Sequence, residues 1–484
     1  MPLNSSFFKL YKAPLLLVVA SFLFYGSFAY YLERSDFTKL IMLYAALFFL
    51  FYKLVTIFKH HIGFLTWMAF GFRCVFILAI PNLSQDFYRF IWDGRLIVEG
   101  INPYIHTVDS FIQKSEFPVL QAQELYRGMG ELNGSHFSNY PPINQLCFAF
   151  AALFAGKSVL GSVIILRLII ICADFGTLYF GKKLLEKLQL PLHNIFWYIL
   201  NPFIIIELTG NLHFEGVMIF FLVWSLYLLH KGKWLFAAFI LGLSISVKLI
   251  PLVFLPLFYQ WFAKRNMISN INKKLDFNSE FALSLPPHND DRKWISNFNK
   301  LTKLLYFYLV IGMTTLLFFV PFYFSGLIDN YSKTIGLWFH QFEFNASLYY
   351  IAREIGYLFR GYNEISTIGK VTPVIVVLFV LMLTFLRKNK TMVQLITSML
   401  LVLSFYYFTA TTVHPWYIAT LLALSIFTKY KFPLVWSFVI VLSYLAYSNP
   451  NNTENLWIIA VEYLIVYSVL FYEIFIKKAT IKAA

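Results

Sequence analysis

Residues 40–58 read LIMLYAALFFLFYKLVTIF, an apolar run that a single lysine interrupts. A helix of about 20 residues crosses the roughly 30 Å hydrocarbon layer of a bilayer, so this run is long enough to span a membrane. Residues 13–31 and 456–476 have the same length and character. Of the 484 residues, 59% are hydrophobic and only 13% are charged, which a water-soluble core cannot accommodate. The sequence therefore predicts an all-α polytopic membrane protein.

The positive charge of the chain indicates how it crosses the membrane. Lysine and arginine outnumber the acidic residues by 39 to 24, which gives a formal net charge of +15. The basic residues lie mostly in short clusters between apolar runs, for example at 182–187 and 387–390, as the positive-inside rule describes for cytoplasmic loops. We predict one integral membrane domain over residues 1–484, with roughly 12–14 crossings and both termini in the cytoplasm. No nucleic-acid partner is expected, because the basicity reflects topology.

Two longer polar regions interrupt the apolar pattern. Residues 81–141 form a large outer loop in this topology, and its many aromatic residues indicate that it is folded, since a linker would hardly need them. Residues 264–303 form a polar cytoplasmic loop that is interpreted as a tether. The candidate chemistry is therefore expected on the outer face.

The outer loop begins with a charged motif, DFYRFIWDGR, at residues 86–95. If residues 86–98 form a short helix at the interface, Asp86, Arg89 and Asp93 share one face, and Arg89 can reach either carboxylate. One carboxylate would then be held by the arginine while the other remains available for chemistry. The alternative is a solvated amphipathic helix with ordinary surface ion pairs.

Further polar residues from distant parts of the chain are expected at the same membrane level. Ionisable side chains next to lipid are costly and tend to mark function, although each one alone is more often a snorkelling or interfacial residue. Together they indicate a polar cavity that is open to the outside. These residues are Glu207, His213, Glu215, Lys248, His340, Glu343, Asn345, His414, Trp416 and Tyr417.

Two arginines are predicted deep inside the membrane. Arg73 and Arg167 lie about eight or nine residues from the outer ends of their apolar runs, which at 1.5 Å per residue places them ~12–14 Å deep. An arginine at that depth needs a carboxylate, a carbonyl or an anionic ligand. An interhelical ion pair with Asp174 is the first interpretation, and the binding of a lipid phosphate is the alternative.

Several motifs in a fixed order resemble a known family. They are the motif at 86–95, GINPY at 100–104, YPP at 140–142, Asn201-Pro202 followed by Glu207 and His213, Lys248 before Pro251, and HPWY at 414–417. This combination is similar to the polyprenyl-phosphate-sugar-dependent glycosyltransferases of the GT-C fold, in their bacterial mannosyltransferase-like branch. One departure is that Phe214-Glu215 follows His213 where that family has a more polar run.

The resemblance implies a fold, a reaction and a set of roles. The fold is a GT-C-like helical bundle with active-site loops on the outer face of the cytoplasmic membrane. The reaction moves a hexose, here mannose, from a polyprenyl-phosphate donor to a glycan, lipid or protein acceptor. Asp86 is the catalytic residue that this resemblance implies. The residues expected to bind substrates are Arg89, Asp93, Arg95, Asn102, Tyr104, Tyr140, Glu207, His213, Glu215, Lys248, His414, Trp416 and Tyr417.

Sugar transfer from a lipid phosphate requires a base, a cation and the exclusion of water. Asp86 would take the proton of the acceptor hydroxyl while that hydroxyl inverts the anomeric carbon. Lys248, His414 or an arginine would stabilise the departing phosphate. No cofactor is expected, although Asp86 and Asp93 could share a divalent cation.

Two other functional classes fit parts of the sequence. A lipid-linked glycan flippase or transporter would also have many helices, but it predicts two related halves, and none is apparent. A polysaccharide polymerase or ligase would also act on lipid-linked sugars at the outer face. Only the order of the motifs argues against this second alternative.

Overall fold

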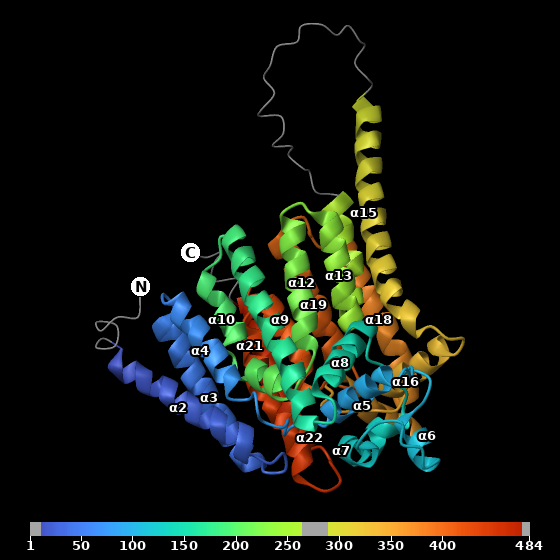
Figure 1. Ribbon diagram of the computed structural model, residues 1–484. Coiled ribbons are helices and arrows are strands. Elements are labelled where there is room, and N and C mark those ends of the chain that lie inside the picture. Colours follow the sequence, from blue (N-terminus) through green and yellow to red (C-terminus); the bar gives the residue numbers. More distant parts are fainter. Residues whose placement is uncertain (1–10, 264–288, 477–484) are drawn as a thin grey trace.

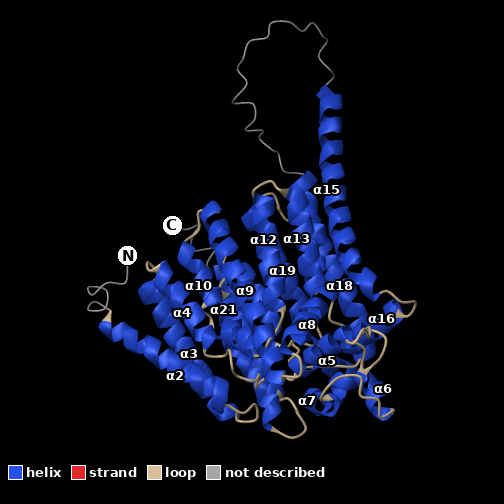
Figure 2. Ribbon diagram, viewed as in Figure 1, coloured by secondary structure: helices blue, strands red, loops and turns tan. Residues whose placement is uncertain are grey.

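The computed structural model of the chain describes residues 11–263 and 289–476, with the side chains of 289–299 and 339–340 left aside. Every extended regular element in these residues is a helix, and one isolated β-bridge joins Phe344 to Thr412 (Figure 2). The helices stand side by side in a bundle (Figure 1). The expectation of an all-α polytopic membrane protein is confirmed.

Within residues 11–263 and 289–476, seven helices are long and apolar enough to cross a membrane. They include the three apolar runs from which the fold was inferred. An eighth span is possible where α11 and η2 (Pro202–Gly210) and α12 (Glu215–His230) form a pair bent by 115°. The seven are α2 (Lys12–Tyr31), α3 (Phe37–Phe58), α9 (Val159–Lys187), the Lys300–Phe322 part of α15 and η4, α18 (Ile365–Phe385), α19 (Met392–Thr409), and α22 with η7 (Leu456–Ile476).

Helices of full spanning length are fewer than the crossings that the sequence suggested. By length and composition seven or eight helices qualify, against the roughly 12–14 that were expected. The difference arises from apolar segments that form helices of only 10–17 residues in the described part of the chain. These are α4 (Ile62–Cys74), α8 (Pro142–Ala155), α13 (Trp234–Val247), η3 with α14 (Ile250–Ala263), η5 with α20 (Pro415–Ser425), and α21 with η6 (Phe432–Ser448).

The remaining helices gather mainly at one end of the bundle. The lower end in Figure 1 carries α5, α6, α7 and α16, together with the turn between α2 and α3, and we call it the cavity end. Short helices also connect α9 to α11, away from these elements. The bounds are α5 (Asp86–Val98), α6 (Val108–Gln113), α7 (Ala122–Ser135), η1 (Leu192–Ile195), α10 (Phe196–Ile199), α16 (Leu327–His340) and α17 (Leu348–Arg360).

The region 81–141 is folded, as its aromatic content indicated, and α5 is its central element. The predicted helix over 86–98 matches α5. Gly94 lets α5 approach α8 closely, because a Cβ atom at this position would lie 2.2 Å from the carbonyl oxygen of Phe148. The glycine of the charged motif is therefore required by packing.

The structure describes only part of the polar loop expected over 264–303. Residues 264–288 lie outside the described residues, whereas 289–303 belong to α15 (Asn289–Phe319). The sequence did not predict a helix over 289–303, because the first residues of α15 are polar and its apolar part begins only further along the chain.

The buried arginines stabilise the bundle. Arg73 Nε pairs with Asp174 Oδ2 at 2.7 Å, and both side chains are fully buried, which confirms the interhelical ion pair. Arg167 instead donates to three backbone carbonyls, those of Ile77, Thr209 and Gly210, at 2.8–2.9 Å. Neither arginine lines the cavity described below, so the alternative of a lipid phosphate held by these two residues is not supported.

Candidate active site

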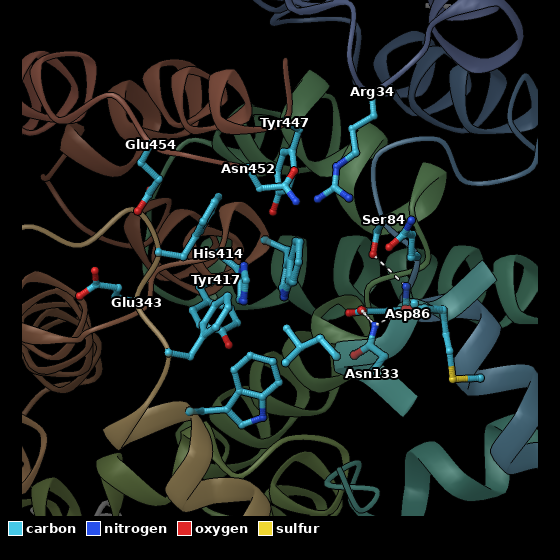
Figure 3. Close-up of a pocket in the computed structure, with 18 of the residues that line it drawn as sticks. Arg34, Ser84, Asp86, Asn133, Glu343, His414, Tyr417, Tyr447, Asn452 and Glu454 are labelled. Atoms are coloured by element: carbon cyan, nitrogen blue, oxygen red, sulfur yellow. Dashed lines mark hydrogen bonds between the residues drawn. The ribbon is translucent and has the colours of Figure 1, made fainter. Parts of the chain in front are cut away.

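A cavity of about 1080 Å³ opens at the cavity end. Its wall combines segments that are far apart in the sequence: the turn after α2, the start of α5, the end of α7, and the loops that precede α17, α20 and α22. In the close-up, Asp86, Ser84 and Asn133 lie together on one side (Figure 3). Glu343 and Glu454 lie on the opposite side. The outer loop and the C-terminal half of the chain therefore share one site.

Asp86 is the first residue of α5 and is half-buried in this wall. Its backbone N–H donates to Ser84 Oγ at 3.3 Å, and Asn133 Nδ2 donates to its Oδ1 at 3.4 Å. Burial raises the pKa of the Asp86 carboxyl above its ordinary value, and the positive charge of Lys248 is the strongest effect in the opposite direction. A carboxylate with raised proton affinity in a cavity suits a general base.

Lys248 and Glu215 form an ion pair in the cavity floor. Lys248 Nζ lies 2.7 Å from Glu215 Oε1, and the two side chains are 22% and 5% exposed. A smaller cavity of about 150 Å³ adjoins here, because it shares Tyr140, Lys248 and Tyr417 with the larger one. Since Glu215 already neutralises it, Lys248 is not a free cation.

A stack of aromatic rings forms the back of the cavity. The rings of His213 and Trp416 are 3.7 Å apart, and those of Trp416 and His414 are 4.6 Å apart, with interplanar angles of 16° and 7°. Burial lowers the pKa of His414 to about 3. His414 is therefore neutral near pH 7, and it can offer hydrogen bonds but no positive charge.

Arg34 is a cavity residue that the motifs did not reveal. It lies in the short turn between α2 and α3, and its guanidinium carbon is 3.2 Å from the ring centroid of Tyr447. Among the described residues no carboxylate lies within ion-pair distance of Arg34, and its buried Nε has no hydrogen-bond partner. A lone arginine in a turn that the predicted topology places outside, against the positive-inside trend, is the sequence signal that would have found it.

On the wall opposite Asp86, the carboxylates of Glu343 and Glu454 already have partners within the protein. Arg353 on α17 contacts Glu343 at 2.6 Å. Glu454 accepts hydrogen bonds from the Tyr350 hydroxyl and from the backbone N–H of Asn345. Burial raises the pKa of Glu454, and these hydrogen bonds oppose that effect. This wall is therefore stiff, and its charges are largely neutralised.

The structure divides the residues expected from the sequence into two sets. Asp86, Tyr140, Lys248, Glu343, His414, Trp416 and Tyr417 line the large cavity. The other expected residues whose side chains the structure describes do not line it, although Glu215 lines the small one. Residues behind the wall are Arg89, Asp93, Arg95, Asn102, Tyr104, Glu207 and His213.

Arg89 and Asp93 form a buried network beneath Asp86. Arg89 Nε contacts Asp93 Oδ1 at 2.8 Å, and the other carboxylate oxygen of Asp93 accepts from Ser138 and from Gln145. Both oxygens of Asp93 are therefore engaged, and Asp93 does not line the cavity. Of the two carboxylates open to Arg89 in the sequence, Asp93 is its partner, and a cation shared by Asp86 and Asp93 is not supported.

Three other expected residues hold loops in place. Arg95 donates to the carbonyls of Leu120 and Lys157. Asn102 donates to the carbonyl of Phe322 at 2.8 Å, and the Tyr104 hydroxyl donates to the carbonyl of Tyr140. The motif at 100–104 thus anchors the outer loop beside the cavity.

Glu207 lies next to His213, the ring of the stack that does not line the large cavity. Glu207 Oε1 accepts from the Tyr444 hydroxyl at 2.8 Å, and its Oε2 is 3.8 Å from His213 Nε2. Because His213 in turn stacks on Trp416, this pair supports the orientation of a ring that does line the cavity.

The fold and the cavity define a class: a polytopic helical membrane protein with a polar, aromatic-rich site at one end of its bundle. Comparisons with known proteins are consistent with the family resemblance. Residues 28–264 match the family model described as alpha-(1->6)-mannopyranosyltransferase, N-terminal domain, and residues 179–350 match that of the GPI transamidase subunit PIG-U. The first match contains Asp86 and Lys248.

A curated relative points in the same direction. The chain is 23% identical over 192 residues to alpha-(1->6)-mannopyranosyltransferase A of Mycobacterium tuberculosis. The alignment covers 40% of this chain and 35% of the relative, so it spans about a third of the relative's length. No solved structure matches the chain. The resemblance to a GT-C-like bacterial mannosyltransferase is confirmed, at low identity.

Proposed function

We propose that the chain is a membrane mannosyltransferase that uses a polyprenyl-phosphate mannose donor at the outer face of the cytoplasmic membrane. The observation that carries the proposal is Asp86, a half-buried carboxylate with raised proton affinity in a cavity that also holds Arg34, an arginine that no carboxylate in the described part of the chain pairs with. The family match over residues 28–264 supports mannose as the transferred sugar. The acceptor is a glycan, a lipid or a protein.

The reaction uses Asp86 as general base. Its carboxylate takes the proton of the acceptor hydroxyl, the hydroxyl oxygen bonds to the anomeric carbon, and the bond from that carbon to the phosphate oxygen breaks. The electron pair leaves with the phosphate. Because the hydroxyl attacks from the side opposite to the phosphate in a single displacement, the anomeric configuration inverts. Asn133 donates to the carboxylate, and Ser84 Oγ accepts from the backbone N–H of Asp86 at the start of α5.

Arg34 is the best-placed cation for the phosphate. Arg353 is paired with Glu343 and Lys248 with Glu215, whereas Arg34 lies against Tyr447 and no carboxylate of the described residues is within ion-pair distance of it. A guanidinium can bind a phosphate through two parallel hydrogen bonds, which favours arginine at such sites. Lys248 then contributes its charge at longer range. His414 keeps its predicted place in the cavity but acts as a neutral hydrogen-bond partner.

The smaller cavity suits the start of the lipid chain. Besides Tyr140, Lys248 and Tyr417, it is lined by the apolar Met218 and Ile250 and by two tyrosines of α19. Because it adjoins the floor of the large cavity, a phosphate held above it would place the first isoprene unit within its reach. Membrane lipid surrounds the rest of the chain.

A transfer assay with the purified protein in nanodiscs tests this proposal. Polyprenyl-phosphate mannose is expected to support transfer, whereas a nucleotide-linked mannose is not. The product linkage, read by NMR, is expected to be inverted relative to the donor. Use of the nucleotide sugar, or retention of configuration, would overturn the mechanism. Transfer of a preassembled oligosaccharide instead would favour a polymerase or ligase.

Labelling of single cysteines tests the sidedness. In a background in which the three native cysteines are replaced by alanine, Ser135→Cys at the end of α7 is expected to react with an impermeant maleimide added outside cells. Lys231→Cys, between α12 and α13, is expected to react only after permeabilisation. The opposite pattern would place the cavity in the cytoplasm and exclude an outer-face enzyme.

A further inference from the structure

Three neighbouring rings in the cavity wall each carry a buried nitrogen that has no hydrogen-bond partner among the described residues. They are His136 in the loop after α7, Trp338 on α16 and His414 before α20. All three side chains line the large cavity. Buried polar atoms in folded proteins nearly always form hydrogen bonds. Three such nitrogens in one cavity wall therefore indicate that a bound ligand supplies their partners. We call these residues the ring triad.

The rings of the triad are in contact with one another. The rings of His136 and Trp338 are 5.5 Å apart at an interplanar angle of 76°, and those of Trp338 and His414 are 6.3 Å apart at 77°. Each ring is thus edge to face with its neighbour. The wall therefore combines apolar ring faces with separate nitrogen atoms.

Hydrogen bonds to the backbone fix the three segments relative to one another. Thr334 on α16 donates to the carbonyl of Phe137, next to His136. Thr411 donates to the carbonyl of Trp338, which ties α16 to the segment that leads into His414. The triad is therefore a pre-organised surface, although its members come from three distant parts of the chain.

The nitrogens of the triad differ in hydrogen-bonding character. His136 Nδ1 lies 3.0 Å from the carbonyl oxygen of Phe137, which can only accept, so Nδ1 carries the proton and Nε2 is an acceptor. Burial lowers the pKa of His136 to about 4, which keeps this ring neutral. Trp338 Nε1 can only donate. An acceptor and a donor side by side match the hydroxyl groups of one sugar ring, because each hydroxyl can both donate and accept.

We propose that the ring triad is a subsite for a neutral hexose, bound by hydrogen bonds to His136 Nε2, Trp338 Nε1 and His414 Nδ1 and by contact of sugar C–H groups with the ring faces. The subsite adjoins the base, because Asn133, three residues before His136, donates to Asp86. This subsite rests on the proposed function. The hexose is either the transferred mannose or the terminal sugar of the acceptor.

Matched substitutions at His136 and Trp338 test the subsite. Trp338→Phe keeps an aromatic ring and removes only the N–H donor. His136→Asn keeps a donor near the Nδ1 position and removes the acceptor at Nε2, whereas His136→Gln places an amide oxygen near Nε2. A neutral hydrogen bond contributes about 0.5–1.5 kcal/mol, so each loss is expected to raise one substrate KM about 2- to 10-fold, with partial rescue by His136→Gln. Trp457→Phe, whose side chain is 83% exposed, is the control.

The KM that changes identifies the sugar. A higher donor KM places the transferred mannose on the triad, and a higher acceptor KM places the acceptor there. Binding of α-1,6-mannobiose, measured by saturation-transfer NMR in nanodiscs, gives a readout independent of turnover. If wild-type protein transfers mannose but both variants keep wild-type KM values and mannobiose binding, the subsite is wrong and the transferase proposal stands. If wild-type protein transfers nothing but the variants weaken mannobiose binding, the subsite stands and the transferase proposal fails.

Discussion

The helix α5 carries two carboxylates in contrasting surroundings, Asp86 at its first residue and Asp93 two turns later. Asp93 is fully buried, and its two oxygens are occupied by Arg89, Ser138 and Gln145. Asp86 faces a cavity, with one long hydrogen bond from a side chain. A carboxylate whose partners are all supplied by the protein stabilises the fold, whereas one with spare capacity is available to a substrate.

Removing the proton acceptor at Asp86 gives the largest expected change in activity. Asp86→Asn keeps the size of the side chain, so the fold is expected to survive. General-base catalysis typically contributes about 10²- to 10⁴-fold, and turnover should fall by that factor. The measurement is a mannosyl-transfer assay on purified protein. Asp329→Asn, an exposed carboxylate of α16 outside the cavity, should retain full turnover. Near-normal turnover of Asp86→Asn would show that Asp86 is not the base.

The same change at Asp93 should act on stability instead. Removing one partner of a buried ion pair costs about 3–5 kcal/mol, because Arg89 is left as an uncompensated buried charge. Asp93→Asn is therefore expected to lower the temperature of thermal unfolding in detergent by many degrees, while Asp86→Asn leaves it almost unchanged. If Asp93→Asn instead keeps its thermal stability and abolishes transfer, the roles of the two carboxylates are reversed.

Two arginines of the cavity differ in the same way as the two carboxylates. Arg353 forms an ion pair with Glu343, whereas no carboxylate of the described residues pairs with Arg34. Hydrogen bonds that involve a charged group contribute about 1.5–3 kcal/mol, so Arg34→Met is expected to raise the donor KM about 10- to 100-fold with little change in the acceptor KM. Arg360→Met, at the exposed end of α17, is the control. A change confined to the acceptor KM would remove Arg34 from the phosphate site.

The sequence was most informative where composition alone determines the structure. The spans at 13–31, 40–58 and 456–476 were predicted from the length of their apolar runs, because a helix must be apolar over about 20 residues to cross a bilayer. Residue type also anticipated the pairing of Arg73 with Asp174, since a buried arginine needs a counter-charge. The short helix over 86–98 was found for a similar reason, because its charges and aromatics repeat at helical spacing.

What the sequence could not supply depends on tertiary contacts. The segments near Pro251, Pro415 and Pro433 are apolar, yet the helices there have only 10–17 residues, and each of these prolines lies in the first turn of its helix, where it marks a helix start that hydrophobicity does not reveal. The ring triad was out of reach because its members are about 200 and 76 residues apart in the chain. Likewise Arg89 could reach either carboxylate by spacing, and only packing selects Asp93.

The smallest expected effect is a shift in pH dependence, and it tests whether Lys248 acts on Asp86 through its charge. The base must be ionised, so activity is present above the pKa of Asp86 and is lost as the pH falls through it. Burial raises this pKa, Lys248 lowers it and Glu215 raises it. Lys248→Met is therefore expected to move the acid limb of kcat/KM to higher pH, and Glu215→Gln to move it to lower pH. The exposed Lys333→Met should leave the limb in place. If the acid limb shifts in opposite directions in the two variants, the effect is due to charge. Loss of packing alone would shift the limb in the same direction in both variants. A limb that does not move in either variant would show that another group sets the acid side of the profile.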